Sequence, residues 1–565
     1  MGYDRSDPGR EGTPASWAWA VFLAAMALSS IFVLWVGKDV RFTADEMTLI
    51  SEVAEMRVGD LFDPYVGHLV LVPLLAYKVL IETAGTGAYA PFQLLTLAAI
   101  FLLGAGVLVW GSRQLPQAVA LVPAVLLVFF PADVLHFIAG NGFTVVLPLA
   151  LGTWALVLWD RRTPLGDIGA SILLILAMST YTVGVAFAVG IALVALLGDR
   201  RRLWVPGLPL LAYGAWRVLI ASQSTDVGDV GPVWSNILLL PAWAFQSVGD
   251  ILVALLGIGF DFAGARDDGG NSAADFAAPT FAVGFFIWVM LRFRRGPMGS
   301  AFWTVSAISI ALFASQVLVW GSLEGRGEPG EERYLYPGAA VVLLVAIELA
   351  RGITWTRAGL ATLWSATAIA LVSATGFLIN EVDRREAGTG MARAQVTAMQ
   401  ILASSPSAPP DLQRAKTIVK NEFDPIATSR FEGLGFSEGS LPAVRPLFRG
   451  EVDRFLATAL ALDLERLPVG REIGPCSTAR RQPGSGSRRA VLPDGEVILK
   501  STRDLEVRLG RYGRAASWPL GPLWANQPAR LFIPTDAGTR PWFVQVDAGS
   551  AGGVEDLLIC RPPRD

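Results

Sequence analysis

The sequence predicts a polytopic α-helical membrane protein with a C-terminal extracytoplasmic α+β domain that ends in a small β-sandwich. Of the 565 residues, 53% are hydrophobic and only 17% are charged, whereas about a quarter of the residues in soluble domains are charged. Near Asn380 the composition changes, and Pro, Gly and charged residues replace the long apolar runs. These observations separate a membrane-embedded part from a soluble C-terminal part.

The charge balance and the rare residue types exclude several functions. The net charge is −3, so no basic surface is available for nucleic acid. The chain contains 2 cysteines and 2 histidines, which are too few for a Cys-rich or His-rich metal site. A bound metal would therefore need carboxylate ligands.

Apolar runs divide the first part of the chain into candidate spans. The first, over 17–36, is longer than the roughly 7–15 apolar residues of a signal peptide, so it is interpreted as a spanning helix rather than a cleaved signal. Short arginine-rich loops stay cytoplasmic, and the clearest of them contain Arg161–Arg162, Arg200–Arg202 and Arg292–Arg295.

All these loops fall on one side if two proline-containing runs, 68–83 and 237–258, lie at the outer interface instead of crossing. This arrangement gives about eleven spans in a plasma-membrane protein with a cytoplasmic N-terminus. An arrangement in which every run crosses remains the alternative.

The resulting domains are a cytoplasmic tail over 1–16, a transmembrane domain over 17–380, an extracytoplasmic helical region over 381–480 and a β-rich domain over 481–565. Short alternating runs predict the strands, and Asp494-Gly495 between two of them predicts a hairpin. Cys476 and Cys560 bracket this region, and outside the cell we expect them to form a disulfide. Two buried thiols are the alternative.

The first outer loop, RFTADEMTLISEVAE, places Asp45 and Glu46 side by side shortly after the first span. A carboxylate there could act as a general base if it reaches the hydroxyl group that it deprotonates. Glu46 could position the acceptor or, with Asp45, bind Mg²⁺ or Mn²⁺. Acidic pairs in loops are also common as solvated surface.

Three further polar residues occur in the predicted outer segments. His68 opens the run GHLVLVPLLAYK, and a ring nitrogen there could bind a sugar hydroxyl or a phosphate, or simply satisfy backbone groups. His136 and Asn141 lie together in PADVLHFIAGNGF, where they could bind a polar ligand or cap a helix.

A fourth candidate is the pair Arg333 and Tyr334 at the start of the run RYLYPGAAVVLLVA. The planar guanidinium of an arginine at the headgroup level suits phosphate oxygens. The alternative is interfacial anchoring, which Arg and Tyr often provide.

These residues carry a family resemblance. TADEMTLISEVAE resembles the Asp-Glu motif in the first outer loop of the GT-C-fold membrane glycosyltransferases, especially the protein mannosyltransferase-like and aminoarabinose transferase-like group. GHLVLVPLLAYKVL and ERYLYPGAAVVLL are similar to segments of related actinobacterial membrane proteins, and the resemblance covers residues 17–380. Two features depart from the pattern: MTLISE follows the acidic pair where the family has aromatic or arginine residues, and the tail matches no sugar-binding module.

The resemblance implies a GT-C-like fold and the transfer of a sugar from a polyprenyl-phosphate carrier to a glycan, lipid or protein acceptor on the outer face. It also implies that Asp45 is the base, Glu46 its companion and Arg333 a contact of the carrier phosphate. The alternatives are a transporter or flippase for a lipid-linked cell-envelope precursor, and a non-catalytic relative. The spanning runs are nearly free of charge and show no internal repeat, which favours surface chemistry over transport.

Overall fold

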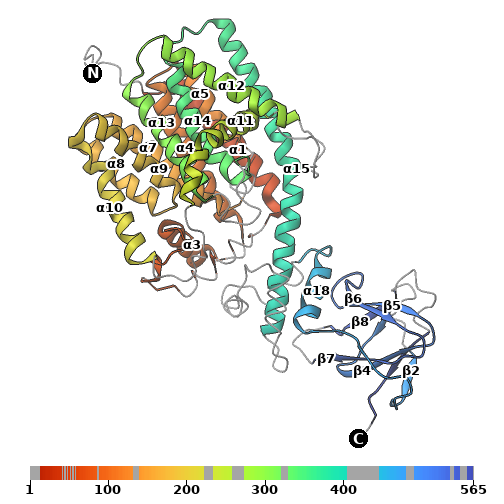
Figure 1. Cartoon of the computed structure of the whole chain (residues 1–565). Helices are drawn as coiled ribbons and strands as arrows, with labels where there is room; N and C mark the ends of the chain where they lie inside the picture. Colours follow the sequence, from red (N-terminus) through yellow and green to blue (C-terminus); the bar gives the residue numbers. More distant parts are fainter. Residues whose placement is uncertain are drawn as a thin grey trace. The chain divides into compact units, whose positions relative to one another are not determined.

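The computed structural model consists of two compact units (Figure 1). The helical unit comprises Met1–Val40, Met56–Thr83 and Ala88–Arg385, and the C-terminal unit comprises Arg41–Glu55, Ala84–Gly87 and Glu386–Asp565. The structure describes residues 13–40, 42, 46, 49, 50, 53, 56–130 except 58, 66, 86 and 87, 139–221, 233–257, 273–319, 329–403, 444–478, 489–534, 540–546 and 556–563.

The helical unit is built almost entirely from apolar helices joined by short connections. Its elements are α1 (Ser16–Val36), η1 (Gly37–Asp39), η2 (Asp60–Phe62), α3 (Leu71–Ala84), α4 (Ala90–Ser112), α5 (Gln117–Val128), α7 (Gly142–Asp160), α8 (Pro164–Met178), α9 (Val183–Leu197), η3 (Arg200–Arg202), α10 (Trp204–Leu219), η5 (Trp234–Leu239), α11 (Leu240–Leu256), α12 (Ala273–Arg294), α13 (Ser300–Val319), α14 (Glu332–Ala350) and α15 (Arg357–Ala403). The last of these, α15, is 47 residues long and continues into the C-terminal unit.

Short loops make consecutive helices run antiparallel, which divides the helical unit into two ends. The arginine end holds the loops with Arg113, Arg161–Arg162 and Arg200–Arg202, which meet through contacts with Asp160 and Asp167. The opposite end, which we call the histidine end, holds His68, the start of α7 and the start of α14. This separation agrees with the predicted grouping of the arginine loops.

Eight helices of the described chain are long and apolar enough to cross a membrane. Seven of them coincide with predicted spans: α1, α4, α7, α12, α13, α14 and the first part of α15. The predicted spans at α5, α8, α9 and α10 are helices of 12, 15, 15 and 16 residues, which is shorter than the about 20 residues that a bilayer needs. The protein is thus a multi-pass membrane protein, and the sidedness of its ends stays a prediction.

The segment predicted to lie at the outer interface, 237–258, forms η5 and α11, whose combined length and composition also meet the criteria for a span. Three contacts show how α11 packs against α14. Trp243 and Asp250 are seven positions apart, yet Trp243 faces Tyr334 and Asp250 lies beside Gly330, only four positions earlier. Ile251, the residue after Asp250, lies against Gly338, so α11 packs against the first two turns of α14. The other segment predicted to lie at the outer interface, 68–83, forms α3, a helix of 14 residues.

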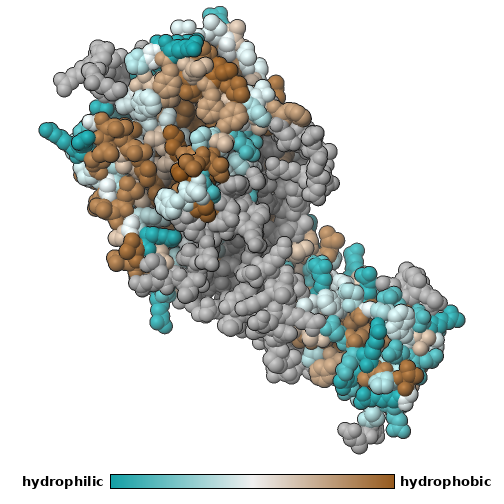
Figure 2. Space-filling view, in the orientation of Figure 1, coloured by the Kyte–Doolittle hydropathy of each residue, from teal (hydrophilic) through white to brown (hydrophobic). Residues whose placement is uncertain are grey.

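Small residues let the helices approach closely, as is usual where lipid surrounds them. A Cβ atom at Gly152 of α7 would lie 2.4 Å from the Phe187 ring of α9. A Cβ atom at Gly190 of α9 would lie 2.7 Å from the backbone nitrogen of Ile308 in α13. The surface of this unit is rich in exposed aliphatic side chains such as Leu197 and Leu211, and Figure 2 shows apolar colour over the helices. Such a surface is expected to face lipid.

The C-terminal unit contains the predicted β-sandwich. One sheet has the order β1-β7-β4-β9-β2 and the other β3-β8-β5-β6, and all neighbouring strands are antiparallel. The strands are β1 (Glu465–Arg466), β2 (Cys476–Thr478), β3 (Arg489–Val491), β4 (Gly495–Ser501), β5 (Leu505–Gly510), β6 (Trp518–Leu523), β7 (Ala529–Ile533), β8 (Phe543–Val546) and β9 (Leu557–Cys560). The sandwich thus begins at Glu465, earlier than the expected residue 481.

The predicted hairpin at Asp494-Gly495 is wrong. Strand β3 pairs with β8, whereas β4 pairs with β7 and β9 in the other sheet. Gly495, with φ of 95°, supplies the turn at which the chain passes from one sheet to the other. The turn signal was correct, but local sequence does not determine which strand becomes the partner.

Two contacts stabilise the sandwich. Cys476 and Cys560 are opposite residues of β2 and β9 and are joined by a disulfide. Asp453 in α18 (Arg449–Ala459) is completely buried and accepts backbone N–H groups from Arg511, Tyr512 and Gly513 at 2.7 to 2.9 Å. This carboxylate attaches the helix to the end of β5.

Candidate functional site

The last turn of α5 contacts both the C-terminal half of α1 and the beginning of α14. Ser29 Oγ of α1 donates a hydrogen bond of 2.7 Å to the carbonyl oxygen of Val128, and the Tyr336 hydroxyl of α14 donates one of 3.1 Å to the carbonyl oxygen of Leu127. Both acceptors belong to the last turn of α5, where carbonyl groups lack helical partners. Gly37 of η1, which follows α1, accepts a hydrogen bond of 3.4 Å from Gln93 Nε2 near the start of α4, so the end of α1 and the start of α14 are both at the histidine end.

Arg333 and Tyr334 lie in the first turn of α14. Arg333 Nε is 2.7 Å from Glu331 Oε2, and its guanidinium carbon lies 4.9 Å from the centre of the Tyr334 ring. About a third of the Arg333 side chain is exposed, whereas its Nε and Nη2 atoms are buried. Its planar donor groups suit the oxygens of a phosphate.

The Tyr334 ring is held in turn by the helices around it. It packs edge-on against Trp243, with ring centres 6.4 Å apart. The Trp243 Nε1 group donates a hydrogen bond of 3.4 Å to Gln316 Oε1 of α13. This aromatic support orients the first turn of α14, so Arg333 stands on a packed surface and not on a loose loop.

His68 lies just before α3 and belongs to a different part of the histidine end. It forms a β-bridge with Tyr65, its Nδ1 shares a hydrogen bond of 3.2 Å with Thr182 Oγ1, and its ring centre is 4.3 Å from that of Tyr181. Burial, and then the charge of Arg217, lower the pKa of His68 from 6.5 to about 4. At neutral pH the ring is thus an uncharged hydrogen-bonding group.

The segment before α3 is attached to the end of α10 by two side chains that the sequence analysis missed. Arg217 Nη1 donates to the carbonyl oxygen of Gly67 at 3.1 Å, and Trp216 Nε1 donates to that of Phe62 at 2.7 Å. Gly67 has φ of 78°, which favours glycine. The available signal was an arginine near the end of an otherwise apolar run.

Asn141 directly precedes α7, and α4 holds this turn. The Thr96 hydroxyl is 2.9 Å from the carbonyl oxygens of Ala139 and Gly140, and the Gly140 N–H donates to the Tyr89 hydroxyl at 2.8 Å. Asn141 thus has a firmly held backbone at the histidine end. His136 lies outside the described residues.

The acidic pair of the first outer loop is only partly described. Asp45 lies outside the described residues, and Glu46 is helical and completely buried within the C-terminal unit. In the part of the chain that the structure describes, no group of three or more His, Cys, Asp or Glu side chains is arranged to hold a metal ion. The expected Mg²⁺ or Mn²⁺ site includes Asp45, so it stays a prediction.

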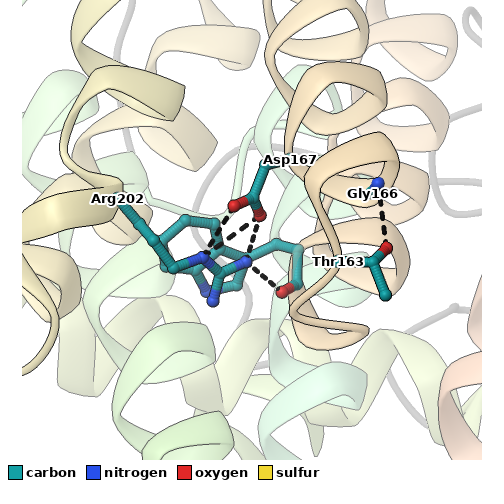
Figure 3. Close-up of polar contacts among 5 residues, drawn as sticks. Thr163, Gly166, Asp167 and Arg202 are labelled. Carbon is teal, nitrogen blue, oxygen red and sulfur yellow. Dashed lines mark hydrogen bonds and ion pairs between the residues drawn. The ribbon is translucent and has the colours of Figure 1, made fainter.

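The arginine end contains a different kind of cluster (Figure 3). Arg202 Nε lies 3.1 Å from both carboxylate oxygens of Asp167, Nη2 donates to the carbonyl oxygen of Trp159 at 2.6 Å, and the guanidinium stacks 3.5 Å above the Trp159 ring. Both charged side chains are nearly buried. These contacts of Arg202 join neighbouring helices to each other, which is a structural role.

Comparison with known proteins gives one distant likeness. No family model matches the chain, and no curated protein does. The chain is similar to the crystal structure of ArnT from Cupriavidus metallidurans bound to undecaprenyl phosphate, with 13% identity and a TM-score of 0.45 over 70% of this chain and 82% of that chain. At this distance no residue role is taken from it.

Proposed function

We propose that the protein is a membrane glycosyltransferase that moves a sugar from a polyprenyl-phosphate donor to an acceptor hydroxyl on the outer face of the membrane. The observation that carries the proposal is the joint anchoring of α1 and α14 on the last turn of α5 through Ser29 and Tyr336. It supports a position for Arg333 at the end of the helical unit where α1 also ends, and the role of Asp45 rests on the resemblance of the first outer loop.

The proposed reaction is a single displacement. The acceptor oxygen attacks the anomeric carbon while the bond between that carbon and the carrier phosphate breaks, so the configuration of the anomeric carbon is inverted. Asp45 takes the proton of the acceptor hydroxyl. The negative charge that develops on the departing phosphate is stabilised by Arg333.

The remaining candidates have supporting roles in this proposal. His68 is uncharged at neutral pH and can exchange hydrogen bonds with hydroxyl groups. Asn141 and His136 are the proposed contacts of the sugar or of the acceptor. Mg²⁺ or Mn²⁺ on Asp45 and Glu46 stays part of the proposal as a further stabiliser of the departing phosphate.

The test is a transfer assay with radiolabelled polyprenyl-phospho-sugars in native membrane vesicles, which carry the cellular acceptors. We expect release of free polyprenyl phosphate by the native chain and none by Asp45→Asn, because the amide cannot accept the proton. Glu82→Gln, at an exposed position of α3, is the matched control and should keep full activity. Translocation of intact donor without bond cleavage would instead indicate a flippase, and equal turnover by Asp45→Asn would remove the base assignment.

A further inference from the structure

The first outer segment belongs to the C-terminal unit, although both of its neighbours belong to the helical unit. The chain leaves the helical unit after Val40 and returns to it at Met56, and the residues between cluster with Glu386–Asp565. The described side chains of this segment are almost inaccessible, with exposures of 3% for Phe42, 0% for Glu46, 4% for Leu49, 0% for Ile50 and 2% for Val53. A segment that only connected two helices would have no reason to bury its side chains.

Four of these residues form one helical stripe. Positions 46, 49, 50 and 53 are helical, and their spacing of i, i+3, i+4 and i+7 places them on the same face of a helix. We call Glu46, Leu49, Ile50 and Val53 the docking stripe. Three members are aliphatic, as expected for a packed helix face, and the fourth is a carboxylate.

Burying the carboxylate of Glu46 costs free energy, because the group loses its contacts with water unless a partner compensates. Glu46 does have a polar or electrostatic partner. A single polar residue within an apolar contact surface can determine how two elements align, because only one alignment satisfies it. Leucine at this position would bury more apolar area without that selectivity.

We propose that Glu46 is a positioning residue that aligns the first outer segment on the C-terminal unit through the docking stripe. In one respect the inference rests on the proposed function, since the residue that this alignment would place is the candidate base Asp45. The two acidic neighbours then have different roles in the proposal, Glu46 in alignment and Asp45 in proton transfer.

The docking can be measured without any activity assay. The two native cysteines are bonded to each other, so Val53→Cys introduces one free thiol into the full-length protein. We expect this thiol to react slowly with a maleimide in detergent micelles. Adding Glu46→Lys should accelerate the reaction about tenfold or more, because the stripe can no longer stay buried. Glu82→Lys, on exposed α3, is the control for the charge change and should leave the rate unchanged.

Rapid labelling of Val53→Cys alone, or an unchanged rate on adding Glu46→Lys, would overturn the docking. The conservative Glu46→Gln separates positioning from folding, and we expect it to lower kcat with the donor KM unchanged, because the donor site itself is intact. Full kcat in Glu46→Gln would refute the positioning role. If the native protein transfers no sugar at all, the proposed function fails, whereas the labelling rates still decide the docking.

Discussion

Ser29 and Tyr336 donate hydrogen bonds to the carbonyl oxygens of two consecutive residues, Val128 and Leu127, although the donors are more than 300 positions apart in the chain. The acceptors are available because α5 ends there. One short helix thereby fixes both the end of α1 and the beginning of α14. Arg333, the proposed phosphate contact, stands in the first turn of α14, next to this anchor.

The first prediction concerns this anchor. Tyr336→Phe keeps the ring and removes the hydroxyl, so the Leu127 carbonyl keeps only backbone donors such as the Phe130 N–H at 3.5 Å. We expect a loss of about 0.5–1.5 kcal/mol in stability, measured as a lower midpoint of thermal unfolding in detergent. Ser29→Ala should have a similar effect at Val128. Unchanged midpoints in both variants would show that the two contacts do not hold the helices together.

The second prediction concerns Arg333. Arg333→Ala should lower kcat/KM for the lipid-linked donor by about 10²-fold or more, because a cation that stabilises the leaving phosphate is lost. The kcat/KM of Arg333→Lys should lie between the values of the native protein and of Arg333→Ala, since lysine keeps the charge but loses the planar pair of donors. Arg357→Ala, an exposed arginine at the start of α15, serves as the control. Equal kcat/KM for Arg333→Ala and the control would contradict the phosphate contact.

Sequence reasoning predicted the class of the fold, because apolar runs, arginine-rich loops and strand alternation are local signals. It located the sandwich and paired Cys476 with Cys560, which are bonded in the structure. It could not assign strand partners, and Asp494-Gly495 turned out to connect two sheets. Pairing depends on the whole sandwich, not on the turn.

The sequence indicated which residues belong to the candidate site, but not which distant segments they contact. Arg333 and Tyr334 are at a helix start, as the apolar run indicated. The burial of Glu46 and the role of Arg217 were not predictable, because each depends on segments far away in the chain. The periodicity of Glu46, Leu49, Ile50 and Val53 was nevertheless present in the sequence, where it indicates a helix with one apolar face interrupted by an acid.

The third prediction is a pH dependence at His68. Its pKa is lowered from 6.5 to about 4, so the unfolded chain binds the proton more readily than the folded protein does. Stability should therefore fall as the pH decreases from about 6.5 to 4 and should be constant above this window. His68→Gln cannot titrate there and should reduce the slope of unfolding midpoint against pH. Identical slopes in the two proteins would show that His68 is not held in the uncharged form.

The fourth prediction concerns Arg202 and Asp167 at the arginine end. Arg202→Met removes the partner of a nearly buried carboxylate, and we expect a loss of about 3–5 kcal/mol because that charge stays buried without compensation. Adding Asp167→Asn removes the charge as well, so the double variant should be less destabilised than the sum of the two single variants. Unfolding of all four proteins in the same detergent measures this coupling. Additive losses would mean that the ion pair contributes nothing beyond its separate contacts, and that stacking of Arg202 on Trp159 holds the loop instead.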